Sequence, residues 1–142
     1  MIAGPFALAA AGAFFGAALY LSLVEQPARL SLDDAALVKE WTPSDRRGFA
    51  LMAALALVSG ALGLAQYAEF PDVRWAAGAL FCLASWLYSY FVLVPMNNRI
   101  LTLGDANGGA ARAFIRDWGR LEWGQTALGA AACTAYLWAF AD

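Results

Sequence analysis

The chain has 142 residues, of which 62% are hydrophobic and 14% charged, with a formal net charge of −2 and no histidine. Soluble domains are typically about half apolar and about a quarter charged, so this composition excludes an ordinary soluble domain. No basic patch with interleaved aromatic residues indicates a nucleic-acid partner, and two cysteines without histidine are too few ligands for a metal site.

Charged residues leave four long gaps, at residues 1–24, 48–68, 75–98 and 123–141. Each gap is close to the roughly 20 apolar residues that cross a hydrocarbon core. A backbone in lipid must satisfy its own hydrogen bonds, so each gap is expected to be a helix. The sequence predicts an all-α, integral membrane four-helix bundle. It is a single domain over residues 1–142, with spans at about 3–26, 43–68, 73–97 and 110–141.

Basic residues are divided unequally between the two sides of this predicted bundle. The two long connections hold eight of the nine, and Arg74 alone lies on the other side. Cytoplasmic loops carry the excess of lysine and arginine. Both long connections are therefore expected in the cytoplasm, and both termini outside it.

The first span contains Gly12-x-x-x-Gly16, a spacing of small residues that lets helices approach closely. The contact is expected either inside the bundle or with another chain. Ser59, Gly60 and Gly63 give the second span a similar surface. Together these surfaces predict a homo-oligomer or a partner membrane subunit, in addition to contact with the lipid bilayer.

The end of the first span is marked by Pro27, which disfavours helix at the residue before it. We expect a break or kink there, with Glu25 either a charge that reaches the membrane surface or part of a site. Ser31 fits the N-cap of a short interfacial helix that extends to Trp41. Thr42 then fits the N-cap of the second span, with Pro43 at the first helical position and Asp45 three residues after the cap.

The third span is rich in aromatic residues and ends in the stretch Pro95-Met-Asn97-Asn98-Arg99. Trp86 is expected near the membrane midplane, where its indole N–H needs a partner. Cys82, Ser85 and Ser89 form a mildly polar stripe beside it. The stripe is either ordinary packing or the lining of a pocket for a flat, hydrophobic aromatic ligand.

A glycine-rich turn at residues 104–109 leads to an amphipathic extension of the fourth span. At about 100° per residue, the arginines of this extension share one face of the helix. Trp118, Glu122 and Gln125 fall on the other face, at the point where the chain enters the membrane. A carboxylate and an amide are thus directed inward, and this placement marks a candidate site.

Polar residues from three spans are expected at one depth, near the cytoplasmic side. They are Glu25, Gln26, Arg29, Asn97, Asn98, Arg99, Glu122 and Gln125. Ionisable groups at this depth are costly unless they are paired, and they are candidates for function. A carboxylate against an arginine makes a structural clasp, whereas several amides around such a pair bind a polar substrate. Both interpretations stay open.

Three motifs resemble those of the small four-span proteins related to the fungal anthrone oxygenases. The motifs are Leu-Tyr-Leu-Ser-Leu-Val-Glu-Gln-Pro-Ala-Arg-Leu at 19–30, Val-Pro-Met-Asn-Asn-Arg at 94–99, and Trp-Gly-Arg-Leu-Glu at 118–122, followed by Thr126 and Gly129. The resemblance covers nearly the whole chain and implies the same four-span fold. Because that family is mostly bacterial, it also implies the bacterial inner membrane.

The resemblance implies oxidation of an electron-rich, anthrone-type ring to the quinone by dioxygen, without a cofactor. Glu122 is then the expected base, since a general base needs a proton affinity matched to its task. Glu25 is the reserve base, Arg29 the stabiliser of a developing oxyanion, and Asn97 a positioning group. The other expected ligand-binding residues are Gln26, Asn98, Arg99, Trp118, Gln125 and Trp86.

The alternative is a non-catalytic membrane scaffold or accessory subunit that packs with itself or with partner spans. The family usually has two histidines and an arginine where this chain has Gln26, Glu122 and Gln125. A scaffold explains the missing histidines directly, because it needs no base. The sequence alone leaves both functions open.

Overall fold

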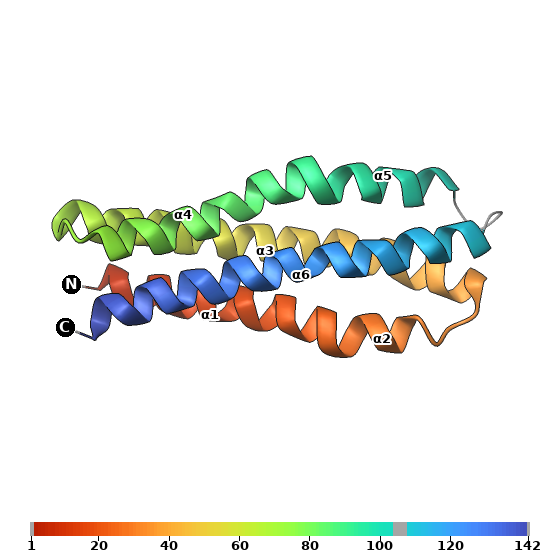
Figure 1. Cartoon of the computed structure of the whole chain (residues 1–142), viewed down its shortest axis with the longest axis horizontal. Coiled ribbons are helices and arrows are strands. Elements are labelled where there is room, and N and C mark those ends of the chain that lie inside the picture. The colour runs from red at the N-terminus through yellow and green to blue at the C-terminus, as the bar shows by residue number, and fades with distance from the viewer. Residues whose placement is uncertain (1, 104–107, 142) are drawn as a thin grey trace.

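The structure, a computed structural model, describes residues 2–103 and 108–141. In these residues the chain forms four antiparallel helical rods (Figure 1). The elements are α1 (Ala3–Tyr20), a π-helical segment (Leu21–Glu25), α2 (Gln26–Arg29), α3 (Asp34–Glu69), α4 (Val73–Tyr88), a second π-helical segment (Ser89–Leu93), α5 (Val94–Leu103) and α6 (Gly108–Phe140). Both chain ends lie at the same end of the bundle (Figure 1).

Three of the rods are long and apolar enough to cross a membrane. They are the helices over Ala3–Arg29, Asp34–Glu69 and Val73–Leu103. The prediction of an all-α bundle is therefore confirmed, and these three helices indicate an integral membrane protein. The predicted fourth span coincides with α6, which is a continuous helix of 33 residues but is not one of these three. Four residues of the predicted glycine-rich turn, 104–107, lie outside the described residues.

The prediction of a separate interfacial helix before the second span is wrong. A single helix of 36 residues, α3, begins after Asp33, whose side chain accepts a hydrogen bond from the Ala36 N–H. Leu37 and Trp41 are fully buried in one core cluster with residues of α6. The first turns of α3 are therefore part of the bundle and are held by packing against α6.

The helix is not broken at Pro27, one of the two outcomes expected there, and the third rod stays helical past Pro95. The N–H of Gln26 bonds to the carbonyl of Leu21, and the N–H of Val94 bonds to that of Ser89. Each of these i to i−5 bonds directly precedes a proline. A proline ring lacks an N–H and clashes with the carbonyl four residues back, and a widened π-helical turn accommodates both effects. The first and third rods therefore continue past their prolines.

The glycines that allow close helix contacts are not Gly12 and Gly16 of the first span. Among the described residues, no atom outside the local backbone of α1 lies within 4 Å of a Cβ atom built on Gly12 or Gly16, so the predicted contact inside the bundle is absent there. A Cβ atom on Gly63 would lie 2.2 Å from the Tyr136 hydroxyl oxygen, and one on Gly78 would lie 2.4 Å from the Tyr136 ring. Tyr136 thus fills the space where α3, α4 and α6 meet.

The link between α3 and α4 is fixed by a local ion pair. The carboxyl of Asp72 accepts a hydrogen bond from the Arg74 N–H and lies 2.6 Å from its guanidinium. The side-chain hydrogen bond from Arg74 lowers the pKa of Asp72. The ionised carboxylate sits at the N-terminus of α4, where the helix dipole favours negative charge.

Candidate functional site

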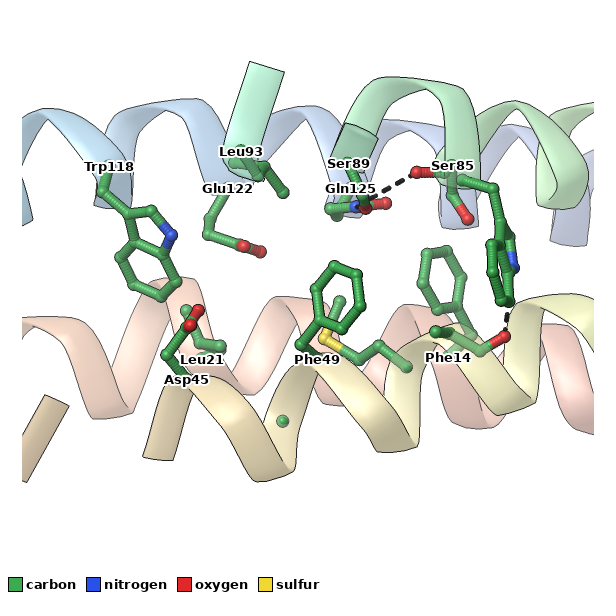
Figure 2. Close-up of a pocket in the computed structure, with 14 residues that line it drawn as sticks. Phe14, Leu21, Asp45, Phe49, Ser85, Ser89, Leu93, Trp118, Glu122 and Gln125 are labelled. Atoms are coloured by element: carbon green, nitrogen blue, oxygen red, sulfur yellow. Dashed lines mark hydrogen bonds between the residues drawn. The ribbon is translucent and has the colours of Figure 1, made fainter. Parts of the chain in front are cut away.

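A small cavity lies in the middle of the bundle, beside both π-helical segments. Its volume is about 30 Å³, which is room for roughly two water molecules. Figure 2 shows the side chains that surround it, from α1, the π-helical segments, α3, α4 and α6. Polar and aromatic side chains in its lining include Asp45, Phe49, Ser89, Trp118, Glu122 and Gln125.

Glu122 is the ionisable residue that α6 directs into this cavity. It is 6% exposed, so the predicted position inside the bundle is confirmed. Among the residues that the structure describes, its Oε2 atom has no hydrogen-bond partner and its carboxyl forms no ion pair. The predicted ion pair with Arg29 or Arg99 is therefore absent. An unpaired buried carboxyl group is costly, and such groups are found at functional sites.

Trp118 and Gln125 flank Glu122 on the same face of α6. The Trp118 Nε1 and Gln125 Oε1 atoms are buried, and neither has a partner within the described part of the chain. The Gln125 Nε2 atom donates to Ser89 Oγ at 2.5 Å. The cavity is thus bordered by a free donor on the indole and by free acceptors on the carboxyl and the amide.

Asp45 faces Glu122 from the opposite side of the cavity (Figure 2), and sequence reasoning missed it. Its two carboxyl oxygens lie 3.2 Å and 3.0 Å from the Asn97 Nδ2 atom, which donates to them. We interpreted the sequence around Asp45 only as a helix start. The signal that could have found it is helical spacing, because Asp45 follows the buried Trp41 by one turn and precedes the buried Met52 by two.

A larger groove of about 360 Å³ runs between α3 and α5, directly outside the cavity. Asp45 and Phe49 line both spaces. The other groove residues combine apolar and polar side chains: Thr42, Arg46, Val94, Asn97, Asn98 and Leu101. Ligand pockets are typically about 300–1,000 Å³ and mainly apolar, with a few polar groups. The groove therefore has the size of a ligand site, whereas the cavity does not.

Arg29 lies behind the cavity, in a network of its own. It forms an ion pair with Glu25, another with Glu40 at 2.9 Å, and a hydrogen bond to Ser44 Oγ at 2.8 Å. Its guanidinium carbon lies 5.5 Å from the centre of the Trp118 ring. Arg29 thus holds Trp118 in place, and its donors are directed to Glu25, Glu40 and Ser44.

The other expected ligand residues are spread around the site. Gln26 is buried and donates to the Ile115 carbonyl at 2.9 Å, which fixes α2 against α6. Trp86 lines the cavity but is 44% exposed, and its Nε1 donates to the Ala53 carbonyl. Asn98 and Arg99 are exposed, and only Asn98 borders the groove. The structure does not bring Arg99 to the cavity.

Comparison with known proteins gives one match. A family model described as anthrone oxygenase matches residues 41–135, which include Asp45, Asn97 and Glu122. No curated protein and no solved structure matches the chain. The matched range contains most of the side chains that line the cavity and the groove.

Proposed function

The chain belongs to the anthrone oxygenase family, and from that premise we propose that it oxidises an electron-rich, anthrone-type ring to the quinone with dioxygen. The observation that carries the proposal is Glu122. Its carboxyl is buried, faces a cavity, and has an oxygen without a partner among the described residues. A group in this setting is suited to exchanging protons with a reacting molecule.

The reaction converts a ring methylene group and dioxygen into a carbonyl group and water. Loss of one proton leaves a carbanion, which is oxidised as dioxygen is reduced and a carbon–oxygen bond forms. The resulting peroxide loses the second carbon-bound proton while its O–O bond breaks. One oxygen atom stays in the quinone, and the other leaves as water.

The site residues support these steps in different ways. Glu122 exchanges protons at its Oε2 atom, and the Trp118 N–H donates to the oxygen that gains negative charge. A fixed donor aimed at developing charge is an efficient form of stabilisation. The groove beside Phe49 is wide enough for a ring system, whereas the cavity holds only small molecules.

Turnover of anthrone in the presence of labelled dioxygen tests this function. Purified protein in lipid nanodiscs should form the quinone faster than protein-free nanodiscs, with one dioxygen consumed per quinone. Mass spectrometry should find one labelled oxygen in the product. Formation at the protein-free rate would show that the proposal is wrong.

The membrane orientation is a second part of the proposal. We propose that α6 crosses the bilayer with the other three rods, because it packs along α1, α3 and α4. Both termini are then outside the cytoplasm, as the positions of the basic residues indicate.

Cysteine labelling on intact cells checks this orientation. In a chain with Cys82 and Cys133 replaced by alanine, a cysteine at Phe70 should react with an impermeant maleimide. A cysteine at Leu32, at the other end of α3, should react only after the membrane is opened. Both positions are exposed in the bundle, 49% and 38% respectively, so a difference in labelling would come from the bilayer and not from burial in the protein. The reverse labelling pattern would contradict the orientation.

The second candidate function is a non-catalytic membrane subunit. It is favoured by the outward face of α1, where Gly12 and Gly16 have open space around them. Small residues on a lipid-facing surface allow another helix to approach closely. A homo-oligomer stays a prediction of this candidate, and the turnover experiment separates it from the enzyme.

A further inference from the structure

Asp45 occupies the boundary between the two spaces of the site. Together with Phe49 it lines both the groove of about 360 Å³ and the cavity of about 30 Å³. Glu122 lines only the cavity. A ring bound in the groove therefore reaches the Asp45 carboxyl first, while a molecule as small as dioxygen fits between Asp45 and Glu122.

The two carboxyl groups differ in their hydrogen bonds. Both carboxyl oxygens of Asp45 accept hydrogen bonds from one nitrogen atom, Asn97 Nδ2, at 3.2 Å and 3.0 Å. No described residue donates to the buried Oε2 atom of Glu122, a residue that lines the cavity. Hydrogen-bond donors stabilise a carboxylate, and a carboxyl group without them is suited to donate its own proton. Asp45 is therefore equipped as a base, and Glu122 as an acid.

We propose, building on the oxidation proposed above, that Asp45 takes the first proton from the ring carbon and that Glu122 protonates the oxygen derived from dioxygen. This assignment gives Asp45 the role of base that the sequence suggested for Glu122. Asn97 is the positioning residue that holds the Asp45 carboxylate toward the groove.

The proton transfers balance over one cycle. Asp45 takes one methylene proton, the carbanion adds dioxygen, and Glu122 protonates the outer oxygen of the peroxide anion. The Glu122 carboxylate then takes the second carbon-bound proton as the O–O bond breaks and the carbonyl forms. The departing hydroxide takes the proton held by Asp45 and becomes water. Both carboxyl groups end as they began, and no net proton is released.

Anaerobic deuterium exchange separates the two roles, because it reports removal of the first proton without oxidation. Anthrone is incubated in deuterated buffer with protein in nanodiscs, and label at its methylene is followed by mass spectrometry above the protein-free rate. Asp45→Asn should lower the exchange rate by about 100-fold or more. Glu122→Gln should keep exchange within about threefold of wild type and lose oxidation by dioxygen.

Two further variants control the experiment. Asp45→Glu restores the carboxyl group and should recover at least about a tenth of the exchange rate. Asp117→Asn removes an exposed carboxylate of α6 and should change neither rate. These variants distinguish a chemical role of Asp45 from damage to the fold.

The remaining outcomes decide against one proposal or the other. Normal exchange in Asp45→Asn, or inactivity of both Asp45 variants, overturns the role of Asp45. Loss of exchange in Glu122→Gln with normal exchange in Asp45→Asn reverses the assignment and also overturns it. If wild-type protein accelerates neither exchange nor oxidation, the proposed function itself fails.

Discussion

Replacing Glu122 by glutamine is expected to lower the rate of anthrone oxidation by about 10²–10⁴-fold, the usual contribution of a general acid or base. Glutamine keeps the shape of the side chain but cannot exchange a proton with the reacting molecule. The bundle should persist, because no ion pair of Glu122 is lost among the described residues. Quinone absorbance in nanodiscs measures the rate, and thermal unfolding of the same sample measures stability.

A matched control is Glu69→Gln, which removes an exposed carboxylate at the far end of α3. Its oxidation rate should equal that of the wild type. An oxidation rate unchanged by Glu122→Gln would show that Glu122 takes no part in the reaction.

Replacing Gly78 by alanine is expected to destabilise the bundle by about 1–3 kcal/mol, the usual cost of overpacking a core. The added Cβ atom would lie 2.4 Å from Tyr136 Cε1 and 2.5 Å from Cδ1. Tyr136 is fully buried and donates to the Ser59 carbonyl at 3.0 Å. The ring therefore has little room to move, and the contact between α4 and α6 must open.

Gly12→Ala is the matched control, because nothing lies within 4 Å of its added Cβ atom. Alanine at an open position in a helix is expected to stabilise it by about 0.5–1 kcal/mol. The free energy of unfolding in mixed micelles measures both variants. Equal effects of the two substitutions would contradict the packing of Tyr136 between the helices.

The helices and the inward face of α6 could be predicted because their signals are local. Gaps between charged residues mark lengths of chain that suit a membrane, and helical spacing places Trp118 and Glu122 on one face. Both of these side chains are buried in the structure. Information contained within one helix was therefore enough to find this part of the candidate site.

The pairing of residues across helices could not be predicted in the same way. Gly12 and Gly16 have the spacing of a contact motif, but contact depends on which side of α1 faces its neighbours. Asp45 resembled a helix-start residue, and only the positions of Asn97 and Glu122 on other rods make it part of a site. Proline likewise predicted an end where a widened turn allowed the helix to continue.

Because of the two π-helical segments, the site is sensitive to the deletion of a single residue as well as to substitutions. Each segment contains a widened turn, and residues from both, Leu21, Ser89 and Leu93, border the cavity. Loss of one codon within Ser89–Leu93 would remove the extra residue of this widened turn and restore ordinary α-helical bonding, which would displace Ser89 or Leu93 from the cavity. Replacing the exposed Phe91 in the same segment leaves the widened turn in place. An in-frame deletion of a single residue here should therefore be more damaging than most substitutions.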